Sequence, residues 1–158
     1  MHRIRSPFHA GTVFPGAFGA IVVFVAAQGG LSRASGAEVS DPAIEISVTT
    51  DRAAYGPDEP IAIRLDVANR TDTSVVFHFS DGQRYDFLIQ NVSGDTLWRW
   101  SADKGFIQML GEEVLGPGET LTFSETFEGQ LTPGTYAVMG KLVATNFPLT
   151  AAAGVTIR

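Results

Sequence analysis

The feature that most constrains the fold is an alternation of apolar and polar residues with a period of two. Ile44, Ile46 and Val48 alternate with polar neighbours, and residues 61–67 repeat the pattern. Successive side chains of a β-strand point to opposite faces of a sheet, so this alternation predicts strands with one buried face. No stretch keeps a helical apolar period for long, and the pattern therefore predicts an all-β domain.

The predicted strands are short and are separated by turns rich in Gly, Pro, Asn and Asp. We predict strands at residues 43–49, 61–67, 75–80, 84–90, 96–101, 121–128, 136–145 and 154–158. Some eight strands at such regular spacing are typical of a β-sandwich or barrel. The segment at residues 102–114 is the most irregular, and we expect at most a short turn of helix there.

One detail favours an immunoglobulin-like sandwich. Tyr136 begins a predicted strand directly after the turn Pro133-Gly134. A tyrosine corner has this pattern, in which the phenol bonds the backbone a few residues upstream. The alternative is an ordinary half-buried tyrosine. We predict an immunoglobulin-like antiparallel β-sandwich of about seven to nine strands.

The first 37 residues have the pattern of an export signal. Arg3 and Arg5 precede an apolar run at residues 17–27, which is too short for a membrane span of roughly 20 residues. Cleavage is expected after Ala27 or Ala37, with Ala37 favoured because the acidic composition begins at Glu38. The chain therefore divides into a signal or targeting segment, residues 1–37, and a domain, residues 38–158.

This division predicts a bacterial protein that is secreted, periplasmic or part of the cell envelope. We expect no stable membrane span after signal cleavage, and the alternatives are an uncleaved anchor or a disordered tail. The chain has no cysteine, which excludes disulfides, thiolate metal sites and a thiol nucleophile. Its stability must therefore come from the core.

The charge of the predicted domain argues against nucleic acid as a partner. From Glu38 onward the chain has 8 basic and 17 acidic residues, a formal charge of −9. Such a surface repels phosphate. A solubility role for these charges is the simplest interpretation.

The sequence also lacks the common catalytic patterns. His78 is the only histidine after residue 37, whereas a catalytic zinc site usually needs three protein ligands. Neither a Gly-x-Ser-x-Gly elbow nor a phosphate-binding glycine loop occurs. We therefore expect no catalytic residues, no metal and no cofactor.

Both tryptophans lie in the second strand of a predicted hairpin at residues 84–101. Trp98 and Trp100 share one face with Arg99 opposite, and Tyr85 and Phe87 share a face of the preceding strand. We expect these aromatic faces to meet in the core. The alternative is an exposed aromatic platform for a protein or sugar partner, with Arg99 at its rim.

Asp86 faces away from its aromatic neighbours on the first strand of this hairpin. An ion pair with Arg84 or with Arg99 is expected. If such a pair is solvent-exposed, it contributes less than about 1 kcal/mol to stability.

The hairpin and the segment after it resemble the BsuPI-type intracellular proteinase inhibitor family. The resemblance extends over roughly residues 44–142, and Tyr136 fits a later turn of the pattern. The residues that carry it are Gln83, Arg84, Tyr85, Asp86, Phe87, Gly94, Trp98, Arg99, Trp100, Ser101, Phe106 and Gln108. The resemblance implies a small β-sandwich whose founding activity is inhibition of a bacterial serine proteinase.

An inhibitor of this kind must offer a rigid loop to the active-site cleft, because pre-organisation lowers the cost of ordering on binding. The irregular segment at residues 102–114 is the candidate loop, and the alternative is a structural connection between sheets. The candidate contact residues are Lys104, Phe106, Gln108, Met109, Leu110 and Arg99.

The predicted function is therefore that of an exported, monomeric, non-enzymatic domain that inhibits a subtilisin-like serine proteinase. The family name says intracellular, whereas the predicted signal indicates export, so the target is not assumed to be cytoplasmic. The alternative is an immunoglobulin-like structural or binding module of the bacterial cell envelope that inhibits nothing.

Overall fold

The computed structural model describes residues 21–24 and 43–158. The predicted targeting segment, residues 1–37, lies outside the described residues except for β1 (Ile21–Phe24). None of the helical structure in the described residues is long and apolar enough to cross a membrane.

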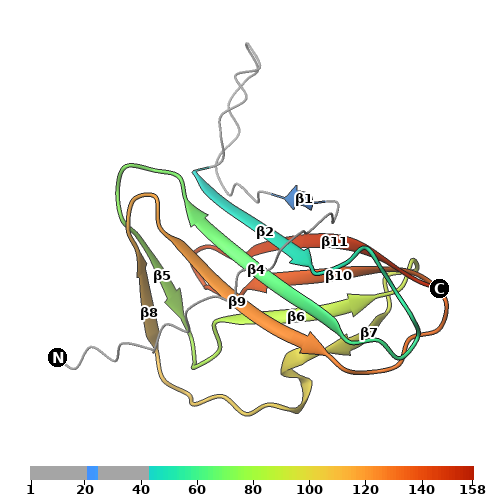
Figure 1. Ribbon diagram of the computed structural model, residues 1–158. Helices are drawn as coiled ribbons and strands as arrows, with labels where there is room; N and C mark the ends of the chain where they lie inside the picture. Colours follow the sequence, from blue (N-terminus) through green and yellow to red (C-terminus); the bar gives the residue numbers. More distant parts are fainter. Residues whose placement is uncertain (1–20, 25–42) are drawn as a thin grey trace.

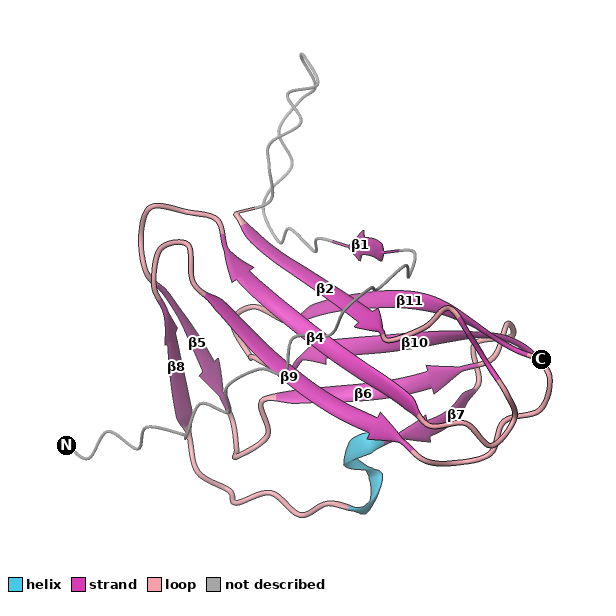
Figure 2. Cartoon of the chain, viewed as in Figure 1, coloured by secondary structure: helices cyan, strands magenta, loops and turns pink. Residues whose placement is uncertain are grey.

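The described chain is almost entirely β-structure, which confirms the predicted fold class (Figure 1). One helical turn, η1 (Trp100–Asp103), follows the seventh strand (Figure 2). The strands after β1 are β2 (Ile44–Thr50), β3 (Ala54–Tyr55), β4 (Ile61–Asn69), β5 (Val75–Phe79), β6 (Tyr85–Gln90), β7 (Thr96–Arg99), β8 (Gly111–Leu115), β9 (Thr120–Phe127), β10 (Gly134–Leu142) and β11 (Leu149–Ile157).

The strands form two layers and a smaller hairpin-like pair. The larger sheet has the order β1-β11-β10-β6-β7, with the short β3 beside β11, and the second sheet has the order β2-β4-β9. Figure 1 shows β2, β4 and β9 crossing over β11, β10 and β6. β5 and β8 pair with each other at one end of the sandwich. All pairs are antiparallel except β3 with β11.

The core consists of the alternating apolar residues of the two facing sheets. Ile46 and Leu65 from one sheet, and Phe87 and Val138 from the other, are fully buried. The layers approach closely at Gly140, where an added Cβ would lie 2.8 Å from Leu65 Cδ1. A larger residue at position 140 would therefore force the sheets apart or displace core side chains.

The predicted tyrosine corner is present. The Tyr136 hydroxyl donates a 2.7 Å hydrogen bond to the carbonyl oxygen of Thr132, four residues upstream. The ring is buried at the start of β10. This bond ties the turn before β10 to the strand, as in immunoglobulin-like domains.

Several strand boundaries differ from the sequence expectation. β7 ends at Arg99, so Trp100 lies in η1 and not in the strand predicted at residues 96–101. β10 runs from Gly134 to Leu142 instead of over residues 136–145.

β8 occupies the end of the segment predicted to be irregular. The sequence hides its alternation, because the partly exposed Glu113 pairs with Arg84 while the apolar Val114 is 64% exposed. β11 begins at Leu149 instead of residue 154, and its alanines have low intrinsic β-propensity. β3 lies between the predicted strands 43–49 and 61–67, where only a turn was expected.

A fully buried asparagine connects the second sheet to β8. Asn69, at the end of β4, is 0% exposed. Its amide nitrogen lies 2.7 Å from Thr73 O, 3.0 Å from Leu115 O and 3.1 Å from Gly116 O. These carbonyl oxygens belong to the turn after β4 and to the end of β8. The amide therefore fixes where β8 lies relative to the sandwich.

We expect Asn69→Ala to lower the free energy of unfolding by about 2–3 kcal/mol, because a fully buried amide loses its bonds, including the buried bond to Leu115 O. Urea unfolding followed by tryptophan fluorescence measures this change. Asn146→Ala is the matched control, since the exposed Asn146 amide makes the same kind of bond to Val76 O at 2.7 Å. Because water can replace that exposed bond, Asn146→Ala should lower the free energy of unfolding by less than about 1 kcal/mol. Equal losses in the two variants would contradict the assigned role.

Candidate functional site

The segment between η1 and β8, residues 104–110, carries a concentration of exposed apolar side chains. Ile107 is 75% exposed, Met109 58% and Leu110 84%. Figure 2 shows this η1–β8 loop running along the margin of the molecule, outside both sheets. Water-exposed apolar side chains gathered in one loop are typical of a surface that binds a partner.

The predicted contact residues divide between this loop and its attachments. Lys104, Gln108, Met109 and Leu110 are exposed, whereas Phe106 is half-buried. Arg99 lies on β7 before the loop begins. Ile107 was not among the predicted contacts, although it is an apolar residue in a segment without strand periodicity, and that signal was available in the sequence.

A buried carboxylate anchors the start of the loop. Asp86, in the middle of β6, is 0% exposed. Its Oδ2 accepts a 2.6 Å bond from Arg99 Nε and a 2.8 Å bond from the Ser101 hydroxyl. Its Oδ1 accepts a 3.2 Å bond from the Ser101 backbone N–H. The expected pair is thus with Arg99, and it also fixes the turn η1.

The partner of Arg84 is different from the one expected from spacing alone. Arg84 Nε donates to Glu113 of β8 over 3.2 Å, and Nη1 donates to Asp81 O over 2.7 Å. Its guanidinium lies 4.5 Å from the centre of the Phe79 ring. A Cβ at Gly111 would collide with this guanidinium, so the loop joins β8 where only glycine fits without a shift.

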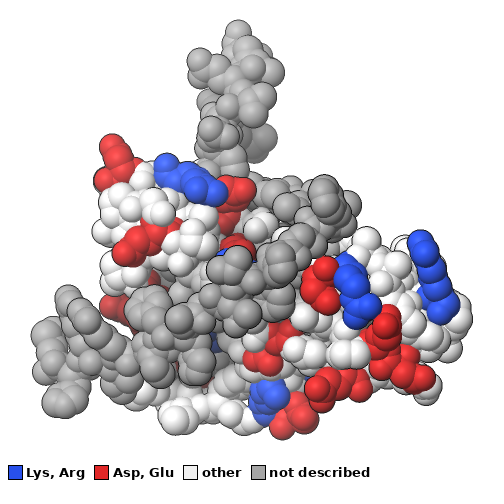
Figure 3. All heavy atoms as spheres, in the orientation of Figure 1, with Lys and Arg blue, Asp and Glu red and all other residues white. Residues whose placement is uncertain are grey.

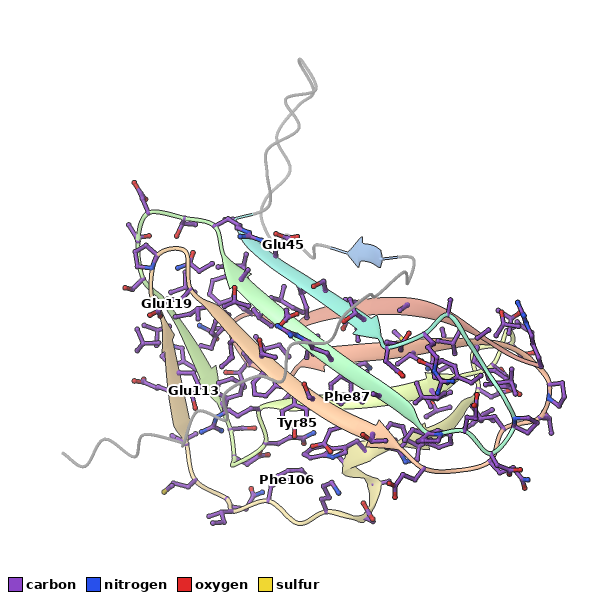
Figure 4. The ribbon with its side chains drawn as sticks, viewed as in Figure 1. Glu45, Tyr85, Phe87, Phe106, Glu113 and Glu119 are labelled. Atoms are coloured by element: carbon purple, nitrogen blue, oxygen red, sulfur yellow. The ribbon has the colours of Figure 1, made fainter. Side chains whose placement is uncertain are left out.

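Aromatic stacking supports the middle of the loop. The Trp100 ring stacks on Tyr85 at 4.5 Å and lies 6.0 Å from the Phe106 ring. Lys104 Nζ lies 4.8 Å from the centre of the Trp100 ring, within the range of a cation–π contact. Figure 4 shows Phe106 on the loop and Tyr85 beside the facing strands. The backbone N–H of Gly82 also donates to Ile107 O over 2.8 Å.

Tyr85 connects this aromatic cluster to the second sheet. Its ring stacks on Phe123 of β9 at 4.4 Å, and its hydroxyl donates to Glu125 Oε1 over 2.5 Å. Burial and the Glu125 carboxylate raise the pKa of Tyr85 above its ordinary value of 10. A phenol is a hydrogen-bond donor at neutral pH in any case, and the raised pKa keeps this link between the sheets intact to a higher pH.

The remaining residues of the sequence pattern lie in the structural framework. Trp98 and Trp100 are half-buried and pack against the core, with Trp98 edge-on to Phe127 at 5.3 Å. Phe87 is fully buried, and Tyr136 forms the corner described above. These side chains support the loop from behind.

The one histidine of residues 38–158 lies at the surface of the β5–β8 pair. The His78 side chain is 49% exposed, and its Nδ1 lies 3.1 Å from Glu112 Oε1. In the same residues, no group of three or more acidic or histidine side chains is placed to hold a metal ion.

A shallow polar hollow of about 330 Å³ lies on the outer face of the β2-β4-β9 sheet. Its charges compensate one another, since Arg64 pairs with Asp66 and Arg70 with Glu45, each at 2.8 Å. Figure 3 likewise shows acidic and basic side chains of the described residues interspersed over one face. The hollow therefore offers little uncompensated charge for an ionic ligand.

Several solved structures are similar to the chain at low sequence identity. They include a β-glucosidase, EmGH1, from Erythrobacter marinus (14% identity, TM-score 0.43, 73% of this chain and 15% of the glucosidase). Others are the sporulation control protein Spo0M from Bacillus subtilis (17%, TM-score 0.49, 73% and 49%) and the CARDB domain of PF1109 from Pyrococcus furiosus (13%, TM-score 0.43, 73% and 94%). The chain thus spans less than half the length of the first two of these proteins.

No curated protein sequence matches the chain. One family model does match, BsuPI, described as intracellular proteinase inhibitor, and the match covers residues 48–147. These residues include both anchors of the η1–β8 loop and well over half of the chain. The chain therefore belongs to the BsuPI family of intracellular proteinase inhibitors.

Proposed function

We propose that this domain inhibits a serine proteinase of the subtilisin type by placing the η1–β8 loop in the active-site cleft. The observation that carries the proposal is an exposed apolar loop whose two ends are both held by side-chain bonds. The buried Asp86 fixes the start of the loop, and the partly exposed pair of Arg84 with Glu113 of β8 holds its end.

A loop held in this way meets the physical requirement for an inhibitor. Binding costs less when the bound conformation already exists in the free protein, because fewer side chains and torsions must be ordered. The same constraint keeps the cut ends of a cleaved loop together, which favours religation over release. A flexible loop would instead be hydrolysed as a substrate.

The side chains of the loop favour a proteinase with apolar specificity pockets. Ile107, Met109 and Leu110 lose exposed apolar surface when they enter such pockets, which contributes about 25 cal/mol per Å² removed from water. Lys104 contacts the Trp100 ring, so it is already engaged and is less suited to a primary pocket. This arrangement favours subtilisin-like over trypsin-like targets.

We also propose that the protein acts outside the cytoplasm. The support is the basic start and apolar run within residues 1–37, which have the pattern of a secretory signal. The target would then be an extracytoplasmic proteinase, although the family description reads intracellular. The alternative, an envelope binding module of the same fold, predicts no inhibition of any proteinase.

Replacing Ile107, Gln108, Met109 and Leu110 by Gly and Ser tests the loop. We expect inhibition of the most sensitive enzyme in a panel of subtilisin-like proteinases to weaken by about 100-fold, because central apolar anchors carry most of the binding energy. Titration of enzyme activity with the purified domain measures the inhibition constant. Phe106 is kept, so that its contact with Trp100 remains.

The matched control replaces Val92 and Leu97 by Ser. They are exposed apolar residues too, at 85% and 51%, but they lie in the β6–β7 hairpin. Their loss should leave the inhibition constant within about threefold, because neither lies in the proposed contact. Full inhibition by a folded loop variant would contradict the proposal, as would a wild-type domain that inhibits no member of the panel.

Asp86→Asn tests whether the buried anchor keeps the loop resistant to cleavage. The change keeps the side-chain volume but weakens the bonds to Arg99 and Ser101. We expect the variant to be about 2–3 kcal/mol less stable, because the hydrogen bonds to a charged and fully buried carboxylate are weakened. We also expect it to be cut within residues 104–110 during incubation with the target proteinase.

Mass spectrometry after incubation detects the cut, and the wild-type domain is the reference. Ser101→Ala, which removes only the hydroxyl bond, should show an intermediate rate of cutting. If Asp86→Asn loses stability while its loop stays intact, Asp86 supports the fold alone.

A further inference from the structure

The strand that follows the loop, β8, has one edge that no strand of the described residues pairs with. In the part of the chain that the structure describes, β8 pairs only with β5, along the register from Val75–Leu115 to Phe79–Gly111. Figure 1 places β8 at the outer margin of the molecule, with β5 between it and the rest of the sandwich. The η1–β8 loop leads directly into this strand.

The bonds of β5 show which backbone groups of β8 point outward. Val76 O accepts from the Asn146 side chain, while His78 O accepts from Thr145 N and His78 N donates to the Asn146 side chain. The backbone groups of Val76 and His78 therefore point away from β8. Residues opposite them in an antiparallel pair also point away.

The residues opposite Val76 and His78 are Val114 and Glu112. Their N–H and C=O groups therefore point out of the β5–β8 pair. None of these four groups has a hydrogen-bond partner in the described residues. They form a row of donors and acceptors at the spacing of a β-ladder, ready to bind another extended chain.

The side chains of this edge leave it accessible. Val114 is 64% exposed, and the Glu112 side chain is 66% exposed and faces His78. Leu110, which immediately precedes the strand, is 84% exposed. Proline and lysine, which commonly block edge pairing in natural sheets, are both absent from β8, whose charged residues are Glu112 and Glu113.

We propose that the edge of β8 binds the proteinase by main-chain pairing with the extended strand that lines its substrate cleft. Proteinases hold their substrates extended, through backbone hydrogen bonds that alternate along the chain. β8 offers such alternating groups at Glu112 and Val114, directly after the loop residues that enter the cleft. The partner strand is thereby added to the β5–β8 sheet, which is a known mode of peptide recognition.

This assignment rests on the proposed inhibition and adds a second element to it. The loop supplies side chains, and the edge supplies backbone bonds. The alternative is that the edge of β8 takes no part in binding and stays in contact with water in the complex.

Amide hydrogen exchange of the free domain and of its complex with the inhibited proteinase tests the assignment without any mutation. The amides of Glu112 and Val114 should exchange rapidly in the free domain and be protected at least about 100-fold in the complex, because both become hydrogen-bonded. The Glu113 amide is the internal control, since it points toward Phe77 of β5 and should be protected in both states.

A pair of variants gives an independent measurement. Val114→Pro removes only an outward N–H, a change that edge strands tolerate. It should weaken inhibition about tenfold, the effect of one lost interfacial bond. Val114→Thr keeps the N–H and the side-chain shape and should stay within about threefold of wild type. If the proline variant fails to fold, the exchange measurement on the wild-type complex decides.

The possible outcomes separate the two proposals. A wild-type domain that inhibits, together with unprotected Glu112 and Val114 amides in the complex, overturns the edge pairing and leaves the loop proposal standing. Equal inhibition by folded Pro and Thr variants does the same. A wild-type domain that inhibits no proteinase overturns the proposed function, and the edge assignment falls with it.

Discussion

The burial of alternating apolar side chains between two antiparallel sheets is the interaction on which the rest of this structure depends. The chain has no cysteine, so no covalent bond helps to hold the layers together. Contact between the layers is close enough at Gly140 to leave no room for a Cβ. Such close packing makes the core a rigid platform, because dense interiors resist local deformation. The attachments of the η1–β8 loop come from β6, from the turn before it at Gly82 and Arg84, and from β8.

The side chains that hold the two ends of the loop are polar, and their polarity has physical consequences. Burying a carboxylate such as Asp86 contributes little net stability, because desolvation offsets most of its attraction to a cation, but its directional bonds select one geometry. Asp86 lies on β6, a strand with both faces buried, and directs Arg99 and Ser101. The apolar core thus provides the stability, while the polar groups determine where the loop lies.

The sequence predicted the strands whose alternation is simple, such as β2 and β4, and the turn before Tyr136. It did not predict β8, because Glu113 turns inward to Arg84 while Val114 faces water. Alternation read in isolation cannot identify a strand whose pattern depends on a partner distant in the chain. The role of Asn69 was missed for the same reason, since its carbonyl partners at residues 115 and 116 are brought near only by the fold. The loop was predicted from its irregularity, and Asp86 was expected to pair with Arg84 or Arg99. Spacing could not decide between these two partners, nor place Arg84 beside Glu113 of β8.

The exposure of Ile107, Met109 and Leu110 affects how the sequence of such a protein can evolve. Their side chains face solvent, while the groups that fix the loop lie at other positions. Substitutions at these three positions are therefore nearly free of any penalty in folding, because exposed side chains contribute little to stability. Target preference can drift under selection by a changing set of enzymes while the scaffold stays constant.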